Sequence, residues 1–453
     1  MTNPQQVLSH FICNSRYEDL PVELIEKAKR HLLDTLGAAL AGANAELTQR
    51  CLRALQICEA SGPAGIWGSA HGLSPRNAAL VNGIAAHALE LDDAGGCDHS
   101  GAVVVPAMLA VLPLCAPMPN GKELLHAMVI GYDIARRVLE ACGGYSPHNE
   151  AGWHSTGTCG VFGAAAACAR LLKLDEKQTS WTLGLAASMS GGLWAFIHDG
   201  TDSKKLHAGR PAESGLLAAL LAKNAVSGPG QVFDDVWGGF LCTLARDAAR
   251  PQALTADLGS VWKLARCSIK PYAACRGTHS AIDAIGDLLK TLNIEAHAIK
   301  SIDVKASAFL VGMCAGVDTT TLAASQMSLP YALAVRCLRG HAGLDAYDPH
   351  ERSSAQILGF MGRITMRVDA QFAPLEEPVV TVFTRDGRHA TQQVKAPLGG
   401  PLNPVSDTQL LEKFNSLARR AIPAVQAQKL AKVCLDLDKA NNLHSLLDLL
   451  RFD

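Results

Sequence analysis

The stretch Gly83-Ile-Ala-Ala-His-Ala-Leu-Glu-Leu-Asp-Asp-Ala-Gly-Gly-Cys-Asp-His-Ser-Gly101, followed by an apolar run up to Leu114, sets the pattern for the whole chain. An alanine-rich helical pattern breaks here at two glycines, beside one histidine and three acids: His87, Glu90, Asp92 and Asp93. Carboxylates at a helix C-terminus face the negative end of the helix dipole, which costs stability unless another group uses them. The alternative is an ordinary glycine-capped helix end. The crowding favours a functional site.

Length and composition bound the classes of function. A chain of 453 residues predicts two domains, or one large domain with an insertion. Only 18% of residues are charged and the net charge is -1, so we expect no nucleic acid and no membrane surface as partner. The 14 cysteines form no CxxC pair, and the N-terminus shows no export or transit signal. We therefore expect reduced thiols and a cytoplasmic protein.

Hydrophobic periodicity predicts a mostly α fold. Helical patterns fill nearly all of the first 260 residues, among them 74–93 and 212–223. Several are apolar all round, which indicates burial between other helices. Strand patterns appear only later, around 299–306, 364–370, 379–384 and 389–395. We predict a large helical domain built from both chain ends, residues 1–262 and 398–453. Residues 263–397 are predicted to form a smaller, inserted α/β domain.

The local chemistry of the inserted segment predicts one hairpin. Two strand patterns flank Asp386-Gly387, a dipeptide that favours a two-residue type I′ turn. Helical patterns at 277–292 and 325–338 lie between the predicted strands.

Two polar clusters precede alanine-rich helices in the first half of the chain. In the first, Tyr145 to Thr158, Ser155 or Thr156 can cap a helix beside His154, which would give either an anion site or a plain cap with a packed histidine. The second spans 199–210, with three cations and His207. Lys204 and His207 are close enough in sequence to share an anionic ligand, whereas a solvated loop is the alternative. We place Lys204 in this loop, in a wet cleft, and expect Lys205 to point away.

Two further clusters lie in the α/β segment. In the run from Lys270 to His279, carboxylate binding by Arg276 and His279 is favoured over a Cys275 nucleophile, because no separate acid is evident. Tyr331 stands in an apolar helix, where a phenol alone is more often part of the core. The sequence contains no HExxH, DxDxDG, GxGxxG or P-loop pattern. We therefore expect no metal and no cofactor.

Five motifs occur in the order seen in the MmgE/PrpD family, and the resemblance covers essentially the whole chain. They are Glu90-Leu-Asp-Asp with His99-Ser-Gly, Gly152-Trp-His-Ser-Thr-Gly, Ser203-Lys-Lys-Leu-His-Ala-Gly, Lys270-Pro-Tyr with Cys275-Arg-Gly-Thr-His, and Ser328-Leu-Pro-Tyr. The family includes 2-methylcitrate dehydratase, cis-aconitate decarboxylase and iminodisuccinate epimerase. The resemblance implies a helical domain with a smaller α/β lid, an active site between them and a homodimer.

The resemblance also supplies residue roles. We predict catalytic roles for His99, Tyr145, His154, Lys204, His279 and Tyr331. We predict substrate binding by Glu90, Asp92, Asp93, His207, Arg210, Lys270 and Arg276. The chain has Lys205-Leu-His207 and Glu213-Ser-Gly where the dehydratase branch differs, so it is more similar to the decarboxylase and epimerase branch. Cys275 stands where the decarboxylase pattern has a second histidine.

The chemistry that the resemblance implies is proton transfer next to a carboxylate. Cations and hydrogen-bond donors stabilise the developing negative charge, and no redox cofactor is needed. The expected function is a cofactor-independent lyase that dehydrates or decarboxylates a small di- or tricarboxylate. One alternative is an epimerase of an α-substituted dicarboxylate. The other is a non-catalytic protein that binds small acids.

Overall fold

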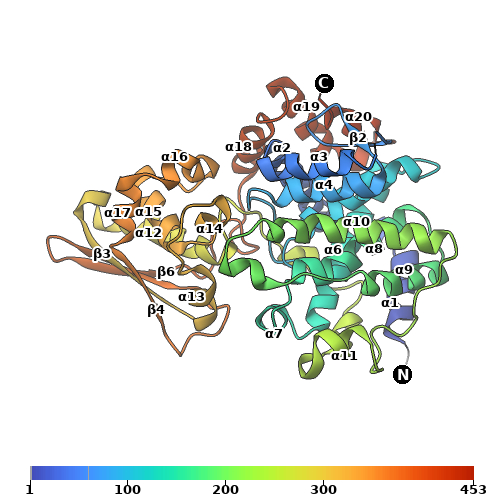
Figure 1. The fold of residues 1–453 in the computed structure, drawn as a ribbon, viewed down its shortest axis with the longest axis horizontal. Helices are drawn as coiled ribbons and strands as arrows, with labels where there is room; N and C mark the ends of the chain where they lie inside the picture. Colours follow the sequence, from blue (N-terminus) through green and yellow to red (C-terminus); the bar gives the residue numbers. More distant parts are fainter. Residues whose placement is uncertain (1–2, 60, 453) are drawn as a thin grey trace. The chain divides into compact units, whose positions relative to one another are not determined.

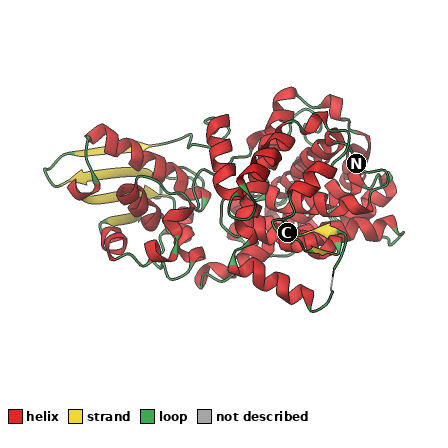
Figure 2. Cartoon of the chain, turned by 90° about the horizontal axis from the view of Figure 1, so that it is seen from above, coloured by secondary structure: helices red, strands yellow, loops and turns green. Residues whose placement is uncertain are grey.

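The computed structural model describes residues 3–59 and 61–452, and most of them are helical (Figure 2). The chain divides into two compact units. Unit 1 comprises Met1–Trp194, Ser203–Ile269 and Ser406–Asp453; unit 2 comprises Ala195–Asp202 and Lys270–Val405. The mostly α fold is therefore confirmed. Unit 2 begins at residue 270 and unit 1 resumes at residue 406, whereas the sequence predicted these boundaries at 263 and 398. The short segment 195–202 also belongs to unit 2, which the sequence did not predict.

Six long helices form the core of unit 1: α2 (Val22–Ala43), α4 (Pro75–His87), α5 (Ser100–Val111), α6 (Gly121–Ala141), α8 (Ser155–Leu171) and α10 (Ser203–Lys223). Small residues let these helices approach closely. A Cβ atom at Gly83 of α4 would lie 2.7 Å from the Cα atom of Gly209 in α10. This contact packs α4 directly on α10, and the two helices carry residues of the site described below.

The remaining helices of unit 1 cover this core. They are α1 (Pro4–Asn14), α3 (Glu46–Gln56), α7 (Tyr145–Glu150), α9 (Glu176–Ser188), α11 (Phe240–Leu244), α18 (Asp407–Ala418), α19 (Ala424–Leu435) and α20 (His444–Leu449), with a small hairpin of β1 (Ala64–Gly65) and β2 (Gly72–Leu73). Helices α18 and α19 pack on α2, so the two ends of the chain meet (Figure 1). None of the described helices is long and apolar enough to cross a membrane.

Two helix boundaries differ from the sequence prediction, and both matter for the site. The helix expected over 74–93 ends at His87, because Glu90 turns the chain with a φ of 55°. The helix expected to begin at Ala212 begins at Ser203, and Pro211 lies inside it. A proline inside a helix removes one backbone hydrogen bond and usually breaks the helix. Packing of α10 against α4, α5 and α8 carries the helix through it.

Unit 2 contains a four-stranded sheet in the order β4-β3-β5-β6: β3 (Ile299–Ala306), β4 (Ile364–Val368), β5 (Val379–Thr384) and β6 (His389–Gln393). Strands β3 and β4 pair in parallel, and the other pairs are antiparallel. Ile302, Val304, Val380 and Val382 are buried at alternate positions. Helix α12 (His279–Leu292) packs on β5 and β6, and α15 (Leu329–Arg339) packs on α12 and on α17 (Ala355–Met361). Three shorter helices complete the unit: α13 (Ala308–Cys314), α14 (Leu322–Gln326) and α16 (Pro349–Arg352).

The β5–β6 hairpin is confirmed, but the predicted turn type is wrong. Phe383 pairs with His389, so the connection is longer than two residues. The N–H group of Gly387 donates to the carbonyl of Thr384, and Gly387, with a φ of 90°, is the residue of this connection in the left-handed region. A type I′ turn needs a positive φ at both central residues. The geometry is that of a longer loop that closes through a left-handed glycine.

Candidate functional site

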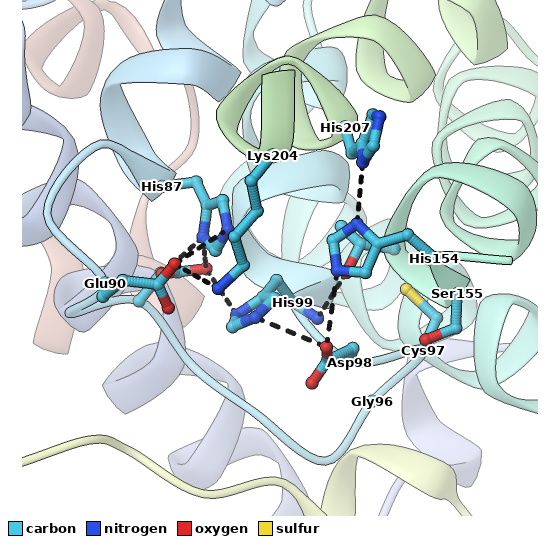
Figure 3. A network of polar contacts seen from close by, with 12 residues as sticks. His87, Glu90, Gly96, Cys97, Asp98, His99, His154, Ser155, Lys204 and His207 are labelled. Atoms are coloured by element: carbon cyan, nitrogen blue, oxygen red, sulfur yellow. Dashed lines mark hydrogen bonds and ion pairs between the residues drawn. The ribbon is translucent and has the colours of Figure 1, made fainter. Parts of the chain in front are cut away.

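The polar cluster of unit 1 forms where the ends of four helices meet. Helix α4 ends at His87, α5 begins after His99 as its N-cap, α8 begins after His154 as its N-cap, and Lys204 is the second residue of α10. These helices pack against one another. Because three N-termini bring partial positive charge to one place, the cluster suits an anionic ligand. Figure 3 shows the side chains that face one another there.

Glu90 lies between two lysines. Its Oε1 atom accepts from the ammonium group of Lys204 and from that of Lys205, the latter at 2.5 Å, and the Nε2 atom of His87 is 3.5 Å away. All four side chains are buried. Burial lowers the pKa of Lys205 to about 8, against the opposing attraction of Glu90. One carboxylate therefore holds two desolvated ammonium groups.

Lys204 and Lys205 both differ from their predicted placement. Lys204 stands on the first turn of a helix rather than in a loop, and only 5% of its surface is exposed, so it does not lie in a wet cleft. Lys205 was expected to point away, yet it contacts the same oxygen of Glu90. The early start of α10 explains both errors, because its first turn packs on the segment after α4.

Asp92 links two imidazole rings. It contacts the Nδ1 atom of His87 at 2.9 Å and the Nδ1 atom of His99 at 3.0 Å. An ionised carboxylate only accepts, so each Nδ1 carries the proton and each Nε2 is directed elsewhere. Burial lowers the pKa of His87 to about 3. Burial alone would raise the pKa of Asp92, but the imidazoles hold it well below its usual range. Asp92 thus fixes the orientation of both rings.

These same three side chains are also the candidate for a metal. His87, Asp92 and His99 place possible ligand atoms within 4.8 Å of one another. Both Nδ1 atoms already hydrogen-bond to Asp92, so the geometry is explained by hydrogen bonds among the three side chains. We assign no metal to them.

Asp93 holds a second set of partners. Its Oδ2 atom lies 3.2 Å from the Nδ1 atom of His31, and its Oδ1 atom accepts from the N–H group of Gly101 at 2.9 Å. Asp92 and Asp93 are both fully buried. Both carboxylates are thus occupied by groups of the protein itself, and their predicted contact with substrate stays a prediction.

Asp98 is the residue that connects the cluster, and the sequence analysis did not select it. Its Oδ2 atom lies 3.5 Å from the Nε2 atom of His99, 3.8 Å from the Nε2 atom of His154 and 3.5 Å from the hydroxyl of Tyr145. Its φ of 125° is costly for a residue with a side chain. Such strain clusters at functional sites. Burial would raise the pKa of Asp98, but the neighbouring histidines and Lys204 hold it well below its usual range.

His154 and His207 share one hydrogen bond between their Nδ1 atoms, 3.0 Å apart. Burial lowers the pKa of His154 to about 4 and that of His207 to about 3, so both are neutral at physiological pH. With its Nε2 atom directed at the carboxylate of Asp98, His154 accepts at Nδ1 from His207. Asp98, His154 and His207 therefore form a chain of polar contacts (Figure 3).

The structure brings most of the predicted residues of unit 1 together, with two exceptions: Asp93, which contacts His31 and Gly101, and Arg210. The assembled set comprises Glu90, Asp92, His99, Tyr145, His154, Lys204 and His207. It also contains His87, which the sequence placed in the cluster without a role, and Asp98 and Lys205, which were not predicted as site residues. Arg210 instead pairs with Glu213, which also pairs with Arg76. Asp98 could have been found from its position, because it lies in the acidic stretch 83–101 directly before His99. Lys205 could be predicted as a site residue only if the start of α10 at Ser203 were known.

Four predicted residues belong to unit 2. Arg276 pairs with Glu377 at 2.9 Å, and the Nε2 atom of His279 lies 3.2 Å from the carbonyl oxygen of Ala274. The hydroxyl of Tyr331 donates to the carbonyl of Ala346 at 2.7 Å, and burial raises the pKa of Tyr331. Lys270 is fully buried.

Comparison with known proteins gives consistent results along the whole chain. The MmgE/PrpD N-terminal domain matches residues 6–252, and the MmgE/PrpD C-terminal domain matches residues 272–438. The cis-aconitate decarboxylase-like protein oryM of Aspergillus oryzae is 28% identical over 98% of this chain and 96% of its own length. Cis-aconitate decarboxylase of Aspergillus terreus is 26% identical (98% and 95%), and that of Homo sapiens is 24% identical (94% and 90%). Since the two domain matches together span most of the sequence, the chain belongs to the MmgE/PrpD family.

Proposed function

We propose that this protein is a lyase that decarboxylates a small tricarboxylate of the cis-aconitate type. The observation that carries the proposal is the convergence of Lys204, His99 and His154 at three helix N-termini around Asp98. Relatives named cis-aconitate decarboxylase, aligned over nearly the full chain, support the substrate class.

Binding and charge stabilisation follow from the electrostatics of the cluster. The helix N-termini and the two ammonium groups offer positive charge to substrate carboxylates. Because these groups are held in place before the substrate arrives, they stabilise negative charge without reorganising during the reaction. The buried carboxylates Asp92 and Asp93 limit where the imidazole rings can point, so the donors keep one orientation.

Decarboxylation needs one bond broken and one proton delivered. The C–C bond to one substrate carboxylate breaks, carbon dioxide leaves, and the electron pair moves into the adjacent unsaturated carbon frame. A proton from the enzyme then forms the new C–H bond. Lys204 is the acid that the geometry favours, because Glu90 keeps its ammonium group in place beside the helix ends. His154 is the other candidate, because its proton is on the Nε2 atom near Asp98. His99 carries its proton on Nδ1, toward Asp92, and is therefore a hydrogen-bonding group of the cluster rather than an acid at Nε2.

We also propose that His279, Arg276, Lys270 and Tyr331 serve the same reaction and that the protein is a homodimer, as family membership suggests. His279→Asn and Arg276→Gln should each lower turnover in the assay below. Light scattering on the purified protein measures the assembly.

The experiment that tests the function is a screen in deuterium oxide. Metal-stripped protein is incubated with cis-aconitate, citrate and 2-methylcitrate, and products are followed by proton NMR. Carbon dioxide loss from cis-aconitate with one deuterium in the product supports the proposal, provided that Lys204→Met abolishes it. Loss of water points to a dehydratase instead. Exchange of an α-proton in an added α-substituted dicarboxylate, without loss of water or carbon dioxide, points to an epimerase. Binding without turnover of any acid rejects catalysis.

A further inference from the structure

Unit 2 contains a groove that the proposed reaction does not use. It has a volume of about 810 Å³ and lies among α12, α15, α17 and the segment after α12. Its apolar lining includes Leu289, Ile294, Leu338 and Phe360, and its cationic lining includes Arg336 and Arg363. One acid, Glu295, is also among the described lining residues, but its side chain is 86% exposed and lies 3.5 Å from His297. The groove therefore combines an apolar floor with the positive charge of two arginines.

Arg336 differs from the other arginines around this groove. Its Nε atom is buried and has no hydrogen-bond partner among the described residues. Arg339, one turn further along α15, contacts both carboxylate oxygens of Glu351. Arg363 donates to the carbonyl of Ile299 at 3.0 Å and lies over the ring of Phe360. A buried donor without a partner is unfavourable, so Arg336 is the group that a ligand would satisfy.

The acids near Arg336 are engaged elsewhere or exposed. Asp283 accepts from the hydroxyl of Tyr272 with one oxygen and from the N–H group of Leu398, at 2.7 Å, with the other. Asp287, on the same helix, is exposed to solvent. Among the described residues, neither carboxylate forms an ion pair with Arg336.

A glycine makes room for the guanidinium group. A Cβ atom at Gly286 of α12 would lie 2.5 Å from the Nη2 atom of Arg336. The guanidinium group thus rests in a notch that only glycine leaves open. Its planar fork suits a carboxylate or a phosphate, which both accept two parallel hydrogen bonds.

We propose that this groove binds an amphipathic organic anion, with its carboxylate or phosphate head on Arg336 and its apolar body along the floor of the groove. The site is separate from the polar cluster of unit 1 and does not depend on the proposed lyase activity. The apolar lining supplies affinity through burial, and Arg336 supplies selectivity for the charged head.

The test is a calorimetric titration of the intact protein with octanoate and with octyl phosphate. Acetate, which has the carboxylate head without the apolar chain, and octan-1-ol, which has the chain without the charge, are the two controls. Saturable binding of either anion, at least about tenfold tighter than acetate and octan-1-ol, supports the proposal. The tighter of the two anions identifies the head group. Equal binding of octan-1-ol and octanoate overturns it, because the charge would then contribute nothing.

Variants locate the binding. Arg336→Gln and Gly286→Ala should each weaken octanoate binding by about tenfold or more. Arg339→Gln is the matched control: it breaks the contact with Glu351 and should lower thermal stability while leaving octanoate affinity unchanged. If Arg336→Gln fails to fold, Arg336→Lys keeps the charge and removes only the fork, and should still weaken binding. Wild-type affinity in the folded Arg336 variant rejects the site.

Discussion

Two buried carboxylates, Glu90 in the segment after α4 and Glu213 on α10, each bind two cations, and they do so in different ways. Glu90 pairs with Lys204 and Lys205, whose side chains are 6% and 5% exposed. Glu213 pairs with Arg76 and Arg210, whose side chains are 45% and 60% exposed. The side chains of the two acids are similarly buried, with exposed fractions of 2% for Glu90 and 3% for Glu213. The two clusters differ in the exposure of the cations and in their kind, buried lysines in one and exposed arginines in the other.

The difference separates structural charge from charge held for chemistry. Exposed arginines neutralise a buried acid while their own charges remain hydrated, so little desolvation is needed. Burying two ammonium groups beside one oxygen costs free energy, because each group loses the hydration that it has in the unfolded chain. Lysine also changes its pKa readily when buried, which arginine does not. We infer that the Glu90 pair serves the reaction and the Glu213 pair serves the fold.

The largest effect is expected from Lys204→Met. Loss of this acid should lower turnover by about 10²- to 10⁴-fold, measured by NMR with cis-aconitate. The variant should keep most of its stability, because Glu90 retains Lys205 as a partner and a buried methionine loses no hydration of a charge. The control is Lys177→Met, at a lysine outside the site that lies over the ring of Trp181. Normal turnover in Lys204→Met would place the acid elsewhere.

Asp98→Gly should separate activity from stability. Glycine tolerates the φ of 125°, so the variant should gain roughly 1 kcal/mol of stability from relief of strain. It removes the carboxylate that His99 and His154 face, so turnover should fall, by less than in Lys204→Met. Asp98→Asn serves as the comparison, because it keeps the strain and the shape but loses the charge. A drop in melting temperature for Asp98→Gly would contradict the assignment of strain.

Lys205→Met should change how stability depends on pH. The pKa of Lys205 is lowered to about 8 in the folded protein from 10.5, so the unfolded chain holds the proton more tightly. Below pH 8 both states are protonated and the cost of burial is constant. Between pH 8 and 10.5 the folded state loses its proton first, so the free energy of unfolding rises with pH, by roughly 3 kcal/mol in total.

Lys205→Met removes this rise, and denaturant unfolding at several pH values measures it against the wild type. Lys205→Arg is the control, because arginine stays protonated over the same range. An unchanged difference between wild type and Lys205→Met from pH 8 to 10.5 would show that the lysine is not desolvated.

Much of the fold could be predicted from the sequence, because hydrophobic periodicity is a local signal. The helical core of unit 1 and the β5–β6 hairpin are both visible in this way. The start of α10 could not be predicted, since Pro211 normally ends or begins a helix and only tertiary packing carries the helix past it. The turn at Gly387 was misjudged because Asp-Gly fits more than one hairpin loop.

The site was predictable in its residue types but not in its connections. The acidic stretch indicated that carboxylates and histidines gather, yet spacing could not show that Asp92 faces two imidazoles while Asp98 links His99 to His154. Those roles depend on backbone conformation, above all on the positive φ at Glu90 and at Asp98. Such conformations are rare for these residue types and leave no local pattern.

The smallest effect is expected from Arg210→Gln, although the sequence suggested that Arg210 binds substrate. Its side chain is 60% exposed and pairs with Glu213, which keeps Arg76 as a second partner. A surface ion pair of this kind contributes about 0–1 kcal/mol, so the melting temperature should change little. Turnover and KM for cis-aconitate should match the wild type. The double variant with Arg76→Gln is the sharper measurement, because it leaves the buried Glu213 with neither arginine and should then lose stability without losing turnover per folded molecule. A large rise in KM for Arg210→Gln alone would instead mean that Arg210 leaves Glu213 to bind substrate, and the contrast between the two carboxylates would no longer hold.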